Sequence, residues 1–174
     1  MFIKTEESQS LIYGAFRLLD LIFHNTVRAI RKGHRNALFS ILASVIQTLV
    51  MVGAFYLFMS VIGLRGVAIR GDFVLYIMSG IFVFMLHIKS MGAVAGAEGP
   101  TAPMLQHLPM STTVSIWSAA FSALYTQLVA MFVILLGYHL LWAPLEVHQP
   151  FGALCMLLLA WFSGCAVGLV LLAI

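Results

Sequence analysis

The stretch Asn36–Leu64, NALFSILASVIQTLVMVGAFYLFMSVIGL, contains no Lys, Arg, Asp or Glu and decides the class of fold. Two further windows, Gly99–Leu145 and Val147–Ile174, are equally free of these residues. A helix needs roughly 20 successive apolar residues to cross the hydrocarbon core of a bilayer, and a charge near its centre costs about 2.5–3.5 kcal/mol on insertion scales. The sequence therefore predicts an all-α integral membrane protein, whose helices satisfy their own backbone hydrogen bonds.

The composition of the chain agrees with this class. Hydrophobic residues make up 62% of the 174 residues and charged residues 9%, whereas a soluble domain has about 25% charged residues. The formal net charge of +3 does not indicate nucleic-acid binding, because the cations gather at one end of the chain. The N-terminus is not that of a signal peptide, since Arg17 and Asp20 interrupt its first apolar stretch and no small-residue cleavage site follows.

Residues 1–35 predict a cytoplasmic segment with an amphipathic helix at the membrane interface. Met1–Gln9 is polar and expected to be frayed, and Ser10–Arg35 has the helical pattern. The polar residues of this helix recur at spacings of three and four, within roughly 80° of one another, at Arg17, Asp20, His24, Arg28, Arg31 and Arg35. This interfacial basic stripe consists of Arg17, His24, Arg28, Arg31 and Arg35. Such a stripe suits lipid phosphate and water; a helix packed on other protein, with its stripe in solvent, is the alternative.

Residues 36–174 predict a domain of four transmembrane helices. The expected spans are Asn36–Ile62, closed by Gly63; Phe73 to about Ile88, capped by Asp72; Val114 to about Leu141; and a last span that begins near Phe151. Between the second and third spans, residues 90–110 are rich in Gly, Ala and Pro, which predicts a cytoplasmic loop with room for one short helix around Thr101–Leu108.

The orientation follows from the distribution of Lys and Arg. Six of these residues precede the first span, and Lys89 is expected on the same side, where its side chain would reach the surface. Only Arg65 and Arg70 fall on the opposite side. We therefore expect a cytoplasmic N-terminus. The aromatic residues expected near the outer interface are Trp142, Tyr138 and Tyr76.

The chain lacks the motifs that nucleotide hydrolysis, metal binding and nucleophilic catalysis require. No G-x-x-x-x-G-K-[ST], H-E-x-x-H, C-x-x-C or G-x-S-x-G is present, and the six histidines are scattered. Cys155 and Cys165 would lie about 15 Å apart on one helix, too far for a disulfide, and are expected as buried thiols. We expect no enzyme activity, no catalytic residue, no cofactor and no metal site.

Small residues repeat at a spacing of four in the fourth span, at Ala160, Gly164 and Gly168. Gly92 and Gly96 repeat the pattern after the second span. Such faces let helices approach closely, so these residues predict helix packing, either inside one bundle or across a dimer interface.

The spans contain few ionisable residues at mid-depth, which argues against an ion or proton pathway. Aromatic residues are frequent in the first two spans instead, at Phe55, Tyr56, Phe58, Phe73, Tyr76, Phe82 and Phe84. Sugar rings stack on aromatic faces, so these residues would line a glycan passage; lipid-facing or packed aromatic side chains are the alternative.

The order of these parts resembles a known family. A basic entry, TVRAIRKGHR at Thr26–Arg35, precedes the first span; Tyr76-Ile-Met-Ser-Gly80-Ile lies in the second; and MLQHLP ends at Pro109 before the third. This resembles the membrane permease of ABC-type exporters for capsular polysaccharide and O-antigen, in which a Y-x-x-x-G-I/L stretch and a proline-ended loop recur. The resemblance covers nearly the whole chain, but that family has six spans, and the last two are missing here.

The resemblance implies a permease subunit of an ATP-driven exporter for a cell-surface polysaccharide, in the bacterial inner membrane. The subunit would form a homodimer around a glycan channel, with energy from a separate cytoplasmic ATPase. The loop Glu98–Met110 would carry a short coupling helix that docks on this ATPase. The residues implied for this ATPase-coupling loop are Glu98, Pro100, Pro103, Gln106, His107 and Pro109.

A second interpretation is a permease-like accessory or structural subunit of a larger bacterial membrane complex, photosynthetic or respiratory. The two missing spans and the lack of intramembrane polar groups favour it. The fourth span runs to Ile174 without a polar or basic flank, although a helix end usually meets water or a partner. We therefore expect a piece of a longer protein, or a chain shortened relative to its relatives.

Overall fold

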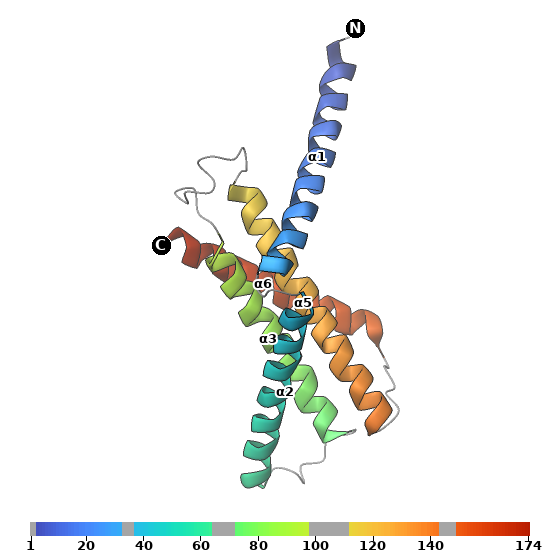
Figure 1. Cartoon of the computed structure of the whole chain (residues 1–174), viewed down its shortest axis with the longest axis vertical. Coiled ribbons are helices and arrows are strands. Elements are labelled where there is room, and N and C mark those ends of the chain that lie inside the picture. Colours follow the sequence, from blue (N-terminus) through green and yellow to red (C-terminus); the bar gives the residue numbers. More distant parts are fainter. Residues whose placement is uncertain (1–2, 33–36, 64–71, 98–111, 143–148) are drawn as a thin grey trace.

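A computed structural model describes residues 3–32, 37–63, 72–97, 112–142 and 149–174, and the regular structure in these ranges is α-helical (Figure 1). The helices are α1 (Ile3–Lys32), α2 (Ala37–Val61), α3 (Phe73–Ala95), α5 (Thr112–Leu141) and α6 (Pro150–Ala173). Four of them, α2, α3, α5 and α6, are long and apolar enough to cross a membrane. The predicted all-α multi-pass membrane fold is confirmed.

The ends of the spans follow local rules that the sequence carries. Gly63 follows α2 with φ +80°, a left-handed conformation that glycine adopts without steric cost. Asp72 is the N-cap of α3, and its Oδ1 accepts a hydrogen bond from the backbone N–H of Val74 at 3.0 Å. Pro150 begins α6, where its missing N–H costs nothing. The prediction of Asp72 as a cap is confirmed.

Two predicted boundaries are wrong. The helix α1 begins at Ile3 rather than after Gln9, because the polar start is rich in Lys, Glu and Gln, which have high helix propensity. The helix α3 continues to Ala95 instead of ending near Ile88. Ser90 and Val94 are fully buried in this extension, so tertiary packing outweighs the glycine content that predicted a loop.

The tightest contact in the bundle joins α3 and α6 through the small residues of α6. Ala160, Gly164 and Gly168 are buried on this face. A Cβ atom on Gly164 would overlap the carbonyl oxygen of His87, and one on Gly168 would lie 2.7 Å from the carbonyl oxygen of Met91. The absence of these Cβ atoms lets the two backbones approach closely, and dispersion forces then hold the helices together.

The helix α5 lies at the centre of the bundle, with α1, α2 and α3 packed around it (Figure 1). An aromatic cluster joins α5 to α6: the Nε1–H of Trp161 donates to the carbonyl oxygen of Ala120 at 3.0 Å. The Trp161 ring lies 5.4 Å from that of Phe121 and 4.8 Å from that of Phe162, between ring centroids. This hydrogen bond satisfies the indole N–H where it is buried.

The opposite end of α5 is tied to the start of α3 by one hydrogen bond. The hydroxyl of Tyr138 donates to Oδ2 of Asp72, the same carboxylate that caps α3. Tyr76 lies one turn further along α3 and is exposed, and Trp142 follows directly after α5. The three aromatic residues that the sequence places at one interface therefore lie at the same end of the bundle.

One polar side chain inside the bundle has no partner. Gln127 on α5 is fully buried, and among the described residues neither Nε2 nor Oε1 of its amide forms a hydrogen bond. Buried hydroxyls behave differently: Thr48 donates to the carbonyl oxygen of Ser44, four residues earlier in α2, as hydroxyls in helices often do. An unpaired buried amide costs about 1–3 kcal/mol, so Gln127 is a weak point of the core.

The α3–α6 contact predicts a position-specific effect of adding one methyl group. We expect Gly164→Ala to lower the thermal unfolding midpoint in detergent, because overpacking a close contact costs about 1–3 kcal/mol. Gly92→Ala is the matched control, since a Cβ at Gly92 has no described heavy atom within 4 Å. Equal midpoints for the two variants would show that α3 and α6 do not meet as described.

Candidate functional site

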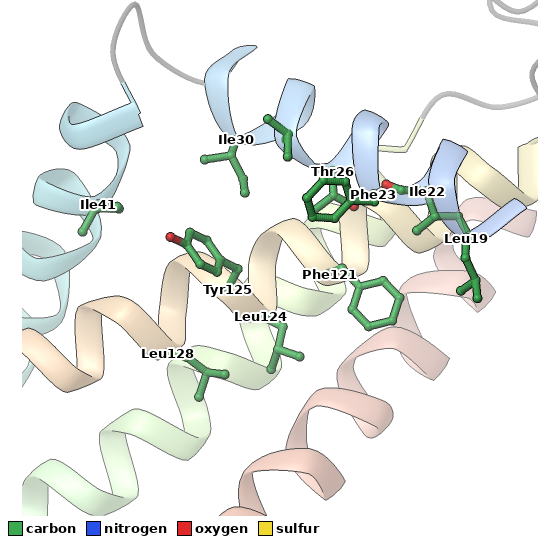
Figure 2. A pocket seen from close by; sticks show the side chains of 11 residues that line it. Leu19, Ile22, Phe23, Thr26, Ile30, Ile41, Phe121, Leu124, Tyr125 and Leu128 are labelled. Carbon is green, nitrogen blue, oxygen red and sulfur yellow. Dashed lines mark hydrogen bonds between the residues drawn. The ribbon is translucent and has the colours of Figure 1, made fainter. Parts of the chain in front are cut away.

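An apolar groove lies between α1 and α5, with one side chain from α2 in its lining (Figure 2). Its volume is about 810 Å³. It is lined by Leu19, Ile22, Phe23, Thr26, Val27 and Ile30 of α1, Ile41 of α2, and Phe121, Leu124, Tyr125 and Leu128 of α5. All of these side chains are apolar except those of Thr26 and Tyr125. We call this feature the apolar groove.

One face of α1 lines the groove, and the opposite face is exposed. Arg17, His24 and Arg28 of the predicted stripe are exposed. At about 100° per residue, the side chains that line the groove point to the other side of the helix. The contact between Nε2 of His24 and Oδ1 of Asp20, at 3.4 Å, is exposed and contributes little to stability.

A long-range hydrogen bond fixes α1 on α5. The Nδ2 of Asn25 donates to Oγ of Ser118 at 3.0 Å, and these residues lie 93 positions apart in the chain. In Figure 1 the first turns of α1 extend beyond the rest of the chain, whereas its last turns lie against α5. The attached half of α1 is thus the half that forms the groove.

Several predicted site residues lie outside the described structure. Arg31 belongs to α1, but its side chain is not described, and Arg35 lies outside the described residues. The six residues predicted for the ATPase-coupling loop, from Glu98 to Pro109, also lie outside them. Their neighbours Ala97 and Thr112, at the end of α3 and the start of α5, are described.

The aromatic residues predicted to line a passage are absent from the lining of the two hollows described in this structure. Phe55 and Phe58 contact each other on α2 and are exposed, whereas Phe82 is buried in the core. The aromatic side chains of the groove come from α1 and α5 instead. Trp117 stacks on the groove residue Phe121, with centroids 5.8 Å apart and an interplanar angle of 28°. Trp117 and Phe121 are four residues apart on α5, a spacing at which side chains of one helix meet. The groove residues of α1 are remote from them in the chain, so their meeting had no local signal.

Lys89 does not lie where the sequence placed it. It is half-buried within α3, and its Nζ donates to Oγ of Ser44 on α2 at 2.8 Å. The expectation that it reaches the surface beyond the span was wrong, because α3 continues for six residues past it. The bundle therefore contains an ionisable group, contrary to the expectation that intramembrane polar groups are lacking.

The two cysteines also differ from the prediction of buried thiols. Cys155 is exposed and Cys165 is partly buried, and both are free. Cys155 lies in the first turns of α6, where the side chains from Pro150 to Met156 are all exposed. This part of α6 extends away from the contact with α3. The prediction of burial failed there because an apolar sequence does not by itself show which side chains are covered by other helices.

The chemistry of the groove is that of a binding surface. Ligand pockets commonly have volumes of about 300–1,000 Å³, a range that includes this groove. No charged side chain lines it, and no group of three His, Cys, Asp or Glu side chains in the described structure is arranged to hold a metal ion. An apolar chain, or a flat ring against the Trp117–Phe121 pair, is the kind of ligand that fits these side chains.

Comparisons with protein families, with curated proteins and with solved structures found no match for this chain. The resemblance to polysaccharide permeases therefore stays a prediction from the sequence.

The attachment of α1 predicts a specific crosslink. In a background with Cys155→Ser and Cys165→Ala, we expect Asn25→Cys and Ser118→Cys to be joined by a short bifunctional thiol reagent, because their native side chains are in contact. His24→Cys with Ser118→Cys is the control, since His24 lies on the exposed stripe. Crosslinking of the control pair at an equal rate would contradict the packing of α1 on α5.

Proposed function

We propose that the chain is a permease subunit of an ATP-driven exporter in the bacterial inner membrane, with a cell-surface polysaccharide as its substrate and a separate cytoplasmic ATPase as its energy source. The observation that carries the proposal is the meeting of helix ends at one pole of the bundle. The last turns of α1 pack on the first turns of α5 through Asn25 and Ser118. Lys89, near the end of α3, contacts Ser44, near the start of α2.

This arrangement supports a coupling role for residues 98–110. The helix α3 ends and the helix α5 begins at the same pole as the basic face of α1. A positively charged pole is expected in the cytoplasm, where an ATPase would dock. Residues 98–110 join these two helices in the chain, so movement of an ATPase bound to them would reach both helices.

The length of α5 supports an interfacial position for α1. At 1.5 Å per residue the 30 residues of α5 extend about 45 Å, whereas the hydrocarbon core is about 30 Å thick. If the part of α5 that exceeds the hydrocarbon core lies at its N-terminal end, the contact between Asn25 and Ser118 lies at the level of the lipid headgroups. The exposed stripe of α1 would then face phosphate and water, as in interfacial helices.

The apolar groove and its aromatic edge support a passage for an amphipathic substrate. Sugar rings stack on aromatic faces such as that of Trp117, which is exposed beside Phe121. The apolar side chains of the groove suit a hydrocarbon portion of the same molecule. A homodimer would enclose such a surface between its two halves.

One observation favours the accessory-subunit function as the second candidate. The first two turns of α6, from Pro150 to Met156, are exposed around their whole circumference. A helix segment that is exposed in the described structure is suited to pack against another subunit of a larger photosynthetic or respiratory complex.

The two functions predict different partners and different effects of the coupling loop. We expect the tagged chain, extracted from its native membrane with a mild detergent, to retain an ATPase subunit, and we expect a scrambled Glu98–Met110 segment to abolish polysaccharide export. Scrambling Leu64–Gly71, at the opposite pole, is the control. Normal export from the Glu98–Met110 variant would count against the exporter, and stoichiometric recovery in a respiratory or photosynthetic complex without ATPase would select the accessory subunit.

A further inference from the structure

A second hollow, more open than the apolar groove, lies among α1, α2, α3 and α5, and both polar side chains and alanines line it. Its volume is about 430 Å³, and it shares no lining residue with the apolar groove. Its polar side chains are Ser40, Ser44, Gln47, Lys89, Ser122 and Thr126. The remaining lining residues are alanines, whose small side chains leave the space open. We call this feature the Lys89 cavity.

The ammonium group of Lys89 has no counter-charge in the described structure. Its hydrogen-bond partner there is the neutral hydroxyl of Ser44, at 2.8 Å. None of the four spanning helices contains Asp or Glu. Asp72, which caps the far end of α3, lies 17 residues away, or about 25 Å along the helix. An ionisable group inside a membrane bundle is costly and normally pairs with an opposite charge, so the charge balance of the cavity is incomplete.

The surroundings of Lys89 add further positive potential and hydrogen-bond donors. Ser40 lies in the first turn of α2, where the helix dipole contributes positive partial charge. The hydroxyl of Thr126 already donates to the carbonyl oxygen of Ser122. The hydroxyls of Ser40, Ser44 and Ser122 and the amide of Gln47 also line the cavity, and each of these groups can donate a hydrogen bond.

We propose that the Lys89 cavity binds a phosphate group. Lysine binds phosphate as a point charge, and the hydroxyls and the amide supply donors for the phosphate oxygens. The cavity is within the size range of small-ligand sites. The phosphate belongs either to the headgroup of an anionic phospholipid or to a soluble molecule, and this site does not depend on the chain being an exporter subunit.

The test is thermal unfolding of the full chain in a neutral detergent, titrated with phosphatidylglycerol, with phosphatidylcholine and with inorganic phosphate. We expect phosphatidylglycerol or inorganic phosphate to raise the unfolding midpoint of the wild type. A rise with phosphatidylglycerol but not with inorganic phosphate identifies a lipid headgroup as the source of the phosphate. A rise with inorganic phosphate identifies a soluble molecule. We expect Lys89→Met to weaken binding of the ligand that raises the midpoint at least about tenfold, because one charge-assisted hydrogen bond is lost. We expect Lys89→Arg to retain this binding.

Two further variants make the test specific. Ala153→Leu adds the same bulk as Ala123→Leu at an exposed position of α6, outside the cavity, and should leave the response unchanged. Ala123→Leu fills the cavity while Lys89 stays in place, and should abolish the response even if Lys89→Met does not fold. The proposal is overturned if neither phosphatidylglycerol nor inorganic phosphate raises the midpoint, or if phosphatidylcholine raises it equally. It is also overturned if the response is undiminished in Ala123→Leu or in a folded Lys89→Met.

Discussion

Hydrocarbon offers no hydrogen-bond partner to a peptide group, and this constraint determines most of what the chain can be. Four long apolar stretches, one of which contains Lys89, must each form a helix, because only a helix satisfies its own N–H and C=O groups inside the segment. The helices then cannot rely on the hydrophobic effect to associate, since lipid is as apolar as their side chains. What holds α3 to α6 is the close approach that Gly164 and Gly168 allow.

The same constraint makes each polar contact in the bundle informative. Both carboxylate oxygens of Asp72 accept hydrogen bonds, one from the backbone of α3 and one from the hydroxyl of Tyr138. Asp72 therefore joins the start of α3 to the end of α5. His87 and Ser163 form a similar link between α3 and α6, with Nδ1 and Oγ 2.9 Å apart. Lys89 and Gln127 stand out because the described structure gives one no counter-charge and the other no partner. Polar groups that are incompletely satisfied in a membrane bundle are the places where a ligand or a movement is to be sought.

The sequence predicted those features that depend on neighbours in the chain. Apolar length predicted the four spans. Asp72 was predicted as the cap of α3 and Gly63 as the end of α2, because each of these rules acts within a few residues. The sequence failed where tertiary contact decides. Burial of Ser90 and Val94 extends α3 through a glycine-rich segment, and Trp161 meets Ala120 across 41 positions. The groove and the Lys89 cavity are each built from helices remote in sequence, so neither had a local signal.

The central claim is that the chain crosses the membrane four times, with the basic face of α1 on the cytoplasmic side. Three spanning helices separate Arg17 from Trp142, and both side chains are exposed. The most direct test introduces Arg17→Cys or Trp142→Cys into the chain without Cys155 and Cys165, and labels spheroplasts with a membrane-impermeant maleimide. The account predicts labelling of the cysteine at position 142 in intact spheroplasts, and of that at position 17 only after permeabilisation. Labelling of both positions from the same side would contradict it.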